Sequence, residues 1–122
     1  MKTRNLIWLL PLLFSNCKNE SSTPCTMEFR YITLTVHGNV LDDFYTLRTS
    51  NGDTIRYAKN EIPGDSIYIV LNDNYQQSLK NSSDTFVFRG LINDSVVVNE
   101  PFVIKADECH IEYMSGNTEV SI

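Results

Sequence analysis

Residues 85–92 read Thr85-Phe86-Val87-Phe88-Arg89-Gly90-Leu91-Ile92, and this stretch decides the fold. Phe86 and Phe88 fall on one face of an extended chain, which is the period-two pattern of a half-buried β-strand. The turn residues Asn93-Asp94 follow, and two more strands are predicted over Ser95 to Asn99 and Phe102 to Ala106. Glu100-Pro101 separates them, because proline fits the start or edge of a strand and not a central ladder position.

A β-hairpin is predicted at Ser50-Asn51-Gly52-Asp53. Two β-prone runs flank this tetrapeptide, Val40 to Thr49 before it and Thr54 to Ala58 after it. Asn-Gly between two such runs is the strongest short hairpin signal, because the turn needs positive φ angles that these residues tolerate. The hairpin extends the β pattern toward the N-terminal half of the chain.

The remaining segments also read as short strands and turns. Thr26 to Val36 is β-prone, and its apolar phase changes near Tyr31-Ile32, which indicates a bulge or a strand that passes between two sheets. Ser66 to Leu71 is an apolar run that predicts a central strand. Tyr75 to Lys80 fits an outer strand or one helical turn, and two last strands are expected over Cys109 to Tyr113 and Glu119 to Ile122.

These elements predict an all-β fold, a single antiparallel β-sandwich of the transthyretin-like or immunoglobulin-like type. About eight short strands at spacings of ~8–12 residues are typical of sandwiches and small barrels. A composition of 42% hydrophobic and 20% charged residues excludes wholesale disorder. The expected organisation is a signal peptide over 1–16, a lipidated N-terminus and short tether over 17–24, and the sandwich domain over 25–122.

The N-terminus has the pattern of a targeting segment. Lys2 and Arg4 precede an uncharged apolar run from Leu6 to Phe14, which is too short to cross a bilayer core of ~30 Å and suits a signal-peptide core. Removing residues 1–16 takes away both basic residues and lowers the formal net charge from −5 to −7. An acidic mature chain argues against nucleic acid as a partner, since binding to phosphates depends on lysine and arginine.

Cys17 directly follows the apolar run, in Phe14-Ser15-Asn16-Cys17. This position resembles the lipobox of bacterial lipoproteins, which implies a lipid-modified Cys17 that anchors the protein in the membrane. Several acyl chains make a stable anchor, whereas one is marginal. Lys18 after the cysteine favours the outer membrane, with orientation toward the periplasm or the cell surface left open. The alternative is an ordinary secretory signal with an incidental cysteine.

Cys25 and Cys109 are the two remaining cysteines and form the obvious pair. Because the envelope outside the inner membrane is oxidising, we expect a disulfide between them. In the chain-entropy model, closing so long a loop contributes roughly 4 to 5 kcal/mol. Two free thiols or a metal site are the alternatives, although a metal site favours clustered ligands.

The chain resembles the small β-sandwich lipoproteins of anaerobic Gram-negative bacteria, whose domains are transthyretin-like or carboxypeptidase-regulatory-like. Two short elements carry the resemblance, the opening Cys25-Thr26-Met27-Glu28-Phe29 and the close Asp107-Glu108-Cys109-His110 with Ser115-Gly116. The resemblance covers essentially the whole mature chain. It implies a fold and a location, and a domain that binds or spaces and does not catalyse.

The pattern of reactive residues predicts no enzyme, no cofactor and no metal site. His37 and His110 are the only histidines, and no H-x-H or H-E-x-x-H motif contains them. The five glycines are isolated, so no phosphate-binding loop is expected. Most carboxylates lie in turn-like sequence, where their side chains bond nearby main chain. A loop calcium site at Asp73 or Asp84 is the alternative.

Tyrosines are the stronger binding candidates. Tyr45, Tyr57 and Tyr68 on an exposed sheet would contact a glycan or a protein, because tyrosine offers a rigid amphipathic surface. The alternative is that these tyrosines lie at the rim of the sandwich, with their hydroxyl groups in contact with water.

Three Asp-Ser/Thr-aliphatic triplets resemble O-glycosylation sites of envelope proteins, with Thr54, Ser66 and Ser95 as acceptors. The same triplets also occur wherever a turn enters a strand.

The sequence therefore predicts a lipid-anchored outer-membrane protein that acts as a non-catalytic binding or assembly module, with an envelope protein or glycan as partner. One alternative is a small envelope inhibitor of the lysozyme-inhibitor type, with a protruding polar loop at Asn60 to Asp65 or Asn72 to Asn74. The other is an accessory subunit of a fimbrial or glycan-uptake complex, for which an exposed sheet edge or tyrosine patch would be the sign.

Overall fold

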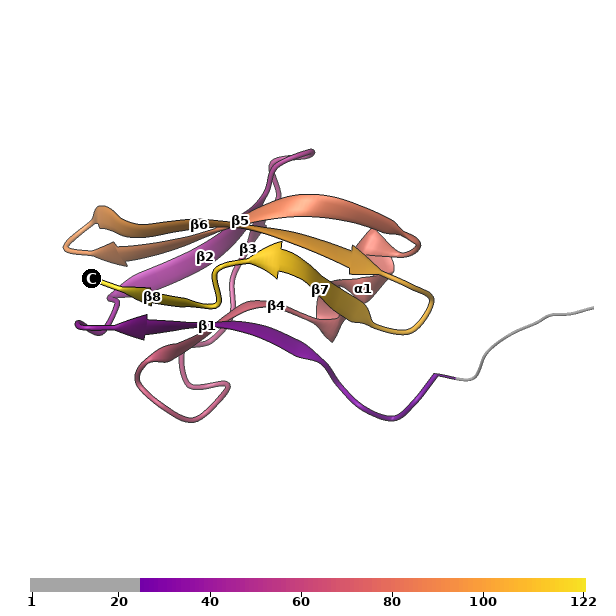
Figure 1. Cartoon of the computed structure of the whole chain (residues 1–122), viewed down its shortest axis with the longest axis horizontal. Helices are drawn as coiled ribbons and strands as arrows, with labels where there is room; N and C mark the ends of the chain where they lie inside the picture. The colour runs from indigo at the N-terminus through magenta and orange to yellow at the C-terminus, as the bar shows by residue number, and fades with distance from the viewer. Residues whose placement is uncertain (1–24) are drawn as a thin grey trace, which may run out of the picture.

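The structure, a computed structural model, describes residues 25–122 and has two β-sheets packed face to face (Figure 1). The elements are β1 (Tyr31–His37), β2 (Asp43–Arg48), β3 (Thr54–Ile55), β4 (Ile67–Asn72), the 3-10 turn η3 (Asp73–Tyr75), α1 (Gln76–Leu79), β5 (Ser82–Ile92), β6 (Ser95–Ala106), β7 (Ile111–Gly116) and β8 (Glu119–Ser121). No helix among these residues is long and apolar enough to cross a membrane. Cys17 and the segments over 1–16 and 17–24 lie outside the described residues.

One sheet has five strands in the order β3-β2-β5-β6-β7, and the other has three in the order β4-β1-β8. This arrangement confirms the predicted all-β sandwich. One strand pair departs from the antiparallel expectation, because β8 runs parallel to β1. The chain leaves β7 in the larger sheet and crosses to the edge of the smaller one, where it continues in the direction of β1 (Figure 1).

The long hairpin of β5 and β6 is the centre of the sandwich. Its ladder runs from the pair Ser82 and Ala106 to the pair Ile92 and Ser95. Asn93 and Asp94 form the turn with φ angles of 52° and 65°, the left-handed conformation of a two-residue hairpin turn. The predicted alternation is confirmed, since the inward side chains are fully buried: Phe86, Phe88, Phe102 and Ile104.

The prediction of two separate strands on either side of Glu100-Pro101 is wrong, because the single strand β6 runs through Pro101. Pro101 pairs with Val87 of β5. On its other side, the ladder with β7 ends at Phe102 and Gly116. The Pro101 carbonyl faces Gly116 on the β7 side. Since the N–H and C=O of one residue point to the same edge of a strand, the N–H that proline lacks would also point to this side, where the ladder with β7 has ended. A proline is tolerated there for the same reason as at an edge.

β4 is an edge strand and not the central strand that its apolar sequence predicted. Its outer main-chain groups are bonded by side chains: Thr46 donates to the Val70 carbonyl at 2.6 Å, and the Asn72 N–H donates to the Tyr57 hydroxyl at 3.2 Å. This covering explains how a buried apolar run ends up at a sheet edge, since its polar groups are satisfied without another strand.

The other local predictions are largely confirmed. The Asn51-Gly52 turn joins β2 to β3, and the Arg48 N–H donates to the Asp53 carbonyl at 2.9 Å. The expected irregularity near Tyr31-Ile32 is a register shift between β1 and β4 after Ile32. The strand predicted from Thr26 begins only at Tyr31, and the ambiguous Tyr75 to Lys80 segment is helical.

We predict that Gly116→Ala lowers stability much more than Gly52→Ala. Both glycines have positive φ, 132° and 77°, and both substitutions strain the main chain. An added Cβ at Gly116 would also lie 2.5 Å from the Phe102 ring and 2.8 Å from the Pro101 carbonyl, whereas nothing lies within 4 Å at Gly52. Denaturant unfolding should show a loss of about 2 to 4 kcal/mol for Gly116→Ala and about 1 kcal/mol for Gly52→Ala. Equal losses would contradict the packing described at the end of β7.

Candidate functional site

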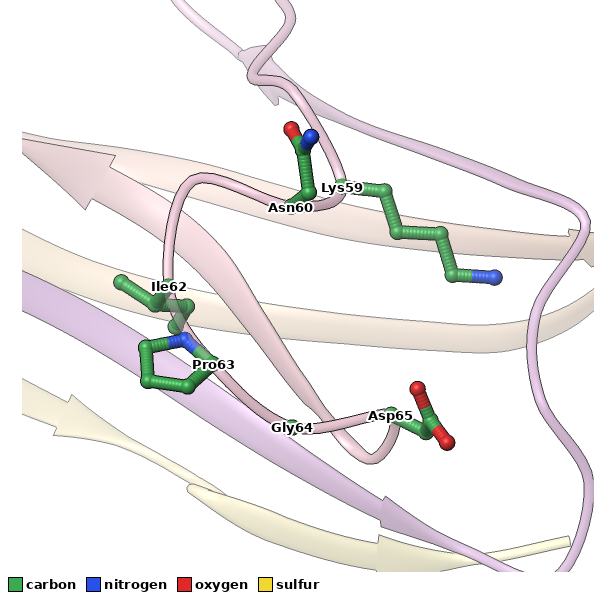
Figure 2. Close-up of a pocket in the computed structure, with 6 residues that line it drawn as sticks. All are labelled: Lys59, Asn60, Ile62, Pro63, Gly64 and Asp65. Atoms are coloured by element: carbon green, nitrogen blue, oxygen red, sulfur yellow. The ribbon is translucent and has the colours of Figure 1, made fainter.

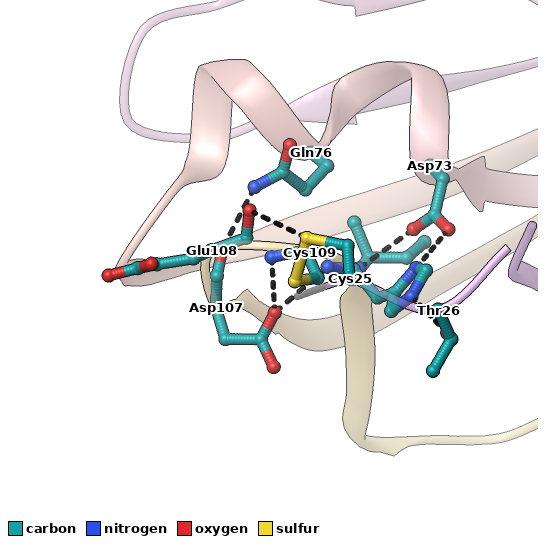
Figure 3. Close-up of a disulfide and its surroundings, with 9 residues drawn as sticks. Cys25, Thr26, Asp73, Gln76, Asp107, Glu108 and Cys109 are labelled. Carbon is teal, nitrogen blue, oxygen red and sulfur yellow. Dashed lines mark hydrogen bonds and ion pairs between the residues drawn. A yellow bond between two sulfur atoms is a disulfide. The ribbon is translucent and has the colours of Figure 1, made fainter. Parts of the chain in front are cut away.

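The expected disulfide is present between Cys25 and Cys109, at the end of the sandwich where the described chain begins (Figure 3). It joins the segment before β1 to the loop before β7 across a sequence separation of 84 residues. Asp107 shapes that loop, because its carboxylate accepts the N–H groups of Cys109 and His110 at 2.7 and 2.8 Å. The main-chain N–H groups lower the pKa of Asp107.

A hydrogen-bonded line of Thr26, His110 and Asp73 lies beside the disulfide (Figure 3). His110 Nδ1 is 2.7 Å from Asp73 Oδ2, and Thr26 Oγ1 is 2.8 Å from His110 Nε2. An ionised carboxylate only accepts hydrogen bonds, so Nδ1 donates, and in the neutral ring Nε2 accepts from the threonine hydroxyl. The order of groups is that of a hydrolase triad.

The surroundings of this line are those of a structural clamp. Asp73 also accepts the Arg30 N–H at 2.8 Å and the Ile111 N–H at 2.9 Å, and its own N–H donates to the Arg30 carbonyl at 3.1 Å. The side chains of His110 and Asp73 are each 8% exposed. These bonds tie the N-terminal segment, η3 and the start of β7 together.

The sequence-predicted tyrosines do not form a binding patch. Tyr68 as a surface contact is wrong, because it is 1% exposed in the core, where its hydroxyl accepts from the Leu41 N–H and donates to the Asp65 carbonyl. Tyr57 is half-buried, and burial raises its pKa to about 12. Tyr45 lies half-exposed on β2, with the Arg56 guanidinium 5.0 Å from its ring centroid.

A different pair of tyrosines borders a groove on the open side of the sandwich. Tyr31 and Tyr113 are 42% and 44% exposed, and the groove between them has a volume of about 380 Å³. We call it the β1–β7 groove. Residues of β1, of β7 and of the chain entering β8 line it: Tyr31, Ile32, Thr33, Thr35, Tyr113, Thr118 and Glu119.

The floor of the β1–β7 groove includes an unpaired strand edge. β8 pairs with β1 only from Thr35 to His37, and the Thr35 N–H donates to the Thr118 carbonyl at 2.8 Å. On the other edge of β1, Val36 and Arg30 bond toward β4 and Asp73.

Successive residues of a strand point their N–H and C=O groups to opposite edges. Odd-numbered residues of β1 therefore face the groove, and within residues 25–122 no strand pairs with that edge at Tyr31 and Thr33.

The groove combines aromatic surface with polar groups. Phe29 is 45% exposed and packs edge-on against Tyr31, with ring centroids 5.2 Å apart. Met114, which follows Tyr113 in β7, is 48% exposed. At the opposite end, the Glu119 carboxylate contacts His37. Such a mixture supports stacking and hydrogen bonding to a ligand.

The polar loop proposed at Asn60 to Asp65 is exposed and connects β3 to β4 (Figure 2). Lys59 anchors it by donating to the Leu41 carbonyl at 2.8 Å. The second loop candidate, Asn72 to Asn74, is wrong as a protruding loop. Asn72 is fully buried and caps η3, and the Asp73 carboxylate belongs to the clamp beside the disulfide.

The three O-glycosylation candidates are all exposed: Thr54 at the start of β3, Ser66 before β4, and Ser95 at the start of β6. Their modification stays a prediction. Within residues 25–122, no three histidine, cysteine, aspartate or glutamate side chains are grouped so that they could hold a metal ion. Asp84, one of the two calcium candidates, accepts from Arg48 at 2.6 Å and from Ser50.

We predict that acid weakens the domain through Asp73. Burial alone would raise the pKa of this carboxyl, but N–H donors from Ile111, Arg30 and His110 outweigh burial and hold the pKa below its usual value. Because the pKa is lower in the folded protein than in the unfolded chain, the ionised carboxylate stabilises the fold at any pH above the unfolded-state pKa. That stabilisation is lost as the pH falls through the folded-state pKa. The melting temperature should fall steeply below about pH 4, and less steeply in Asp73→Asn. Asp65→Asn, in the exposed loop, is the control, and equal pH profiles for all three proteins would contradict the clamp.

The chain was also compared with known proteins. No protein-family model, no curated protein and no solved structure gives a significant match.

Proposed function

We propose that the chain is a lipid-anchored envelope protein that acts as a non-catalytic binding or assembly module through the β1–β7 groove. The observation that carries the proposal is the open side of the sandwich, where the half-exposed Tyr31 and Tyr113 line a groove along the part of β1 that β8 leaves unpaired. Aromatic surface, three threonine hydroxyls and one carboxylate provide the chemistry of recognition. The partner is an envelope protein or a glycan.

The anchor part of the proposal rests on the sequence before the domain. Cys17 follows a signal-peptide-like apolar run, and Cys25 lies eight positions further along the chain. A fully extended tether of that length spans at most about 29 Å. Since Cys25 is joined to Cys109, the tether would hold the disulfide end of the sandwich close to the outer membrane, with the turn at Asn93-Asp94 pointing away.

An envelope inhibitor is the second candidate function, because the Asn60 to Asp65 loop is exposed and Pro63-Gly64 gives it a tight bend (Figure 2). A loop of this kind can enter the cleft of an enzyme. An accessory role in a fimbrial or glycan-uptake complex falls within the main proposal, since the exposed strand edge is the feature it requires. Variants in the groove and in the loop separate these functions.

The first prediction concerns the groove. In native cells treated with a crosslinker, the wild-type protein should capture an envelope protein or glycan, and the double variant Tyr31→Ala/Tyr113→Ala should capture at least about fivefold less, since each truncated aromatic contact is worth about 1 kcal/mol or more. Tyr45→Ala, on a different face, is the matched control. No captured partner above background, or equal capture by all variants, would overturn the groove as the binding surface. If capture of the partner is lost only in a variant of the Asn60 to Asp65 loop, the result would favour the envelope-inhibitor function.

The second prediction concerns the anchor. Cys17→Ser should move the protein from the membrane fraction to the soluble fraction, because acyl chains provide the membrane affinity. Globomycin, which blocks the lipoprotein signal peptidase, should make the wild-type precursor accumulate. Continued processing in its presence would show that Cys17 is not lipidated.

A further inference from the structure

We propose that the β1–β7 groove binds an extended, basic peptide segment of a partner protein, which pairs as a strand with the free edge of β1 at Tyr31 and Thr33. This inference rests on the proposed function and names the class of partner. The segment would extend the three-stranded sheet along the part of β1 that β8 leaves unpaired.

The main chain of β1 provides the first argument. Its last bond to the β8 side is the Thr35 N–H to the Thr118 carbonyl, and the next groups on that edge belong to Thr33 and Tyr31. They repeat every second residue, at ~6.6 Å, which is the repeat that another strand matches. Thr33 is half-buried, and unpaired main-chain groups in such a position favour a partner that satisfies them.

The walls of the groove provide the second argument. Tyr31 and Tyr113 stand on opposite sides and offer flat surfaces to the side chains of a bound strand. The threonine hydroxyls of Thr33, Thr35 and Thr118 add hydrogen bonds beside the ladder. Strand addition takes affinity from the main chain and specificity from such side-chain contacts.

Charge selects the kind of peptide. Glu119 lines the groove, and the chain as a whole has a formal net charge of −5. Lysine or arginine in the partner segment would complement this carboxylate and the net negative charge, and would speed association. A second copy of the chain would bring the same negative charge and is disfavoured for that reason.

A glycan is the competing ligand, since tyrosines and hydroxyls also suit sugar rings. The unpaired edge of β1 favours a peptide over a glycan, because its main-chain N–H and C=O groups have the spacing of another strand. Hydrogen bonds to these groups do not depend on the tyrosine rings. A peptide strand is therefore the ligand that satisfies the unpaired main-chain groups of β1 at Tyr31 and Thr33.

The test selects a phage-displayed library of random linear dodecapeptides on the purified protein and then uses the best synthetic peptide as the probe. We expect lysine or arginine among alternating β-prone residues. Amide hydrogen exchange, read by NMR, should slow at Tyr31 and Thr33 when the peptide binds. Thr33→Pro, which removes one groove-facing N–H, should weaken binding about tenfold, and Thr33→Val, which keeps it, should weaken binding by a smaller factor.

Failure to select any peptide, or a peptide that leaves both amides exchanging at the free rate, would overturn strand pairing. If Thr33→Pro does not fold, strand pairing is tested by whether the peptide protects the Tyr31 and Thr33 amides of the wild-type protein. Loss of the native partner in Tyr31→Ala/Tyr113→Ala, together with no peptide binding, would keep the groove as a binding site and assign it to a glycan. No peptide and no effect of the tyrosine variants would overturn the proposed function as well.

Discussion

The length of β8 is the constraint on which the open side of this sandwich depends. β1 pairs with β4 from Tyr31 to Thr35, whereas β8 reaches only Thr35 to His37 on the opposite edge. A longer β8 would cover that edge and close the groove. Gly116 ends β7 just before the chain crosses to β8, and it lies so close to Phe102 and Pro101 that a side chain at this position would clash with them.

The opposite arrangement holds at the disulfide end, where hydrogen bonds and the disulfide fix the first described residues to the domain. The disulfide, the Asp73 carboxylate and the buried His110 ring all hold the segment from Cys25 to Arg30. Closing a loop of this length stabilises the domain by roughly 4 to 5 kcal/mol in the chain-entropy model, a large part of what a domain of this size has. This end is where the described chain begins, and the unpaired edge of β1 starts a few residues further on, at Tyr31.

Local patterns in the sequence predicted much of the fold. The Phe86 and Phe88 alternation, the Asn51-Gly52 turn and the cysteine pair each depend on residues close together or on a simple count, and the structure contains all three features. Pro101 and the apolar run of β4 misled because strand order decides whether an edge is free, and strand order is set by distant residues.

The site was less predictable than the fold for the same reason. Tyr68 and Tyr31 each precede an isoleucine in a predicted strand, yet Tyr68 lies in the core and Tyr31 at the groove. Their exposure depends on which strands lie beside them, and no property of the tyrosines themselves reports this. The phase change near Tyr31-Ile32 was the one local signal at the groove, and it marks the place where the pairing of β1 with β4 shifts.

Amide hydrogen exchange along β1 in the ligand-free protein tests the central claim most directly. The account predicts that protection alternates along β1. The amides of Ile32 and Leu34 are protected by β4 and that of Val36 by the Ser66 carbonyl, and the amide of Thr35 is protected by the Thr118 carbonyl. The amides of Tyr31 and Thr33 exchange rapidly. Strong protection of Tyr31 and Thr33 in the free protein would show that the edge is already paired, and would contradict the account of an open binding groove.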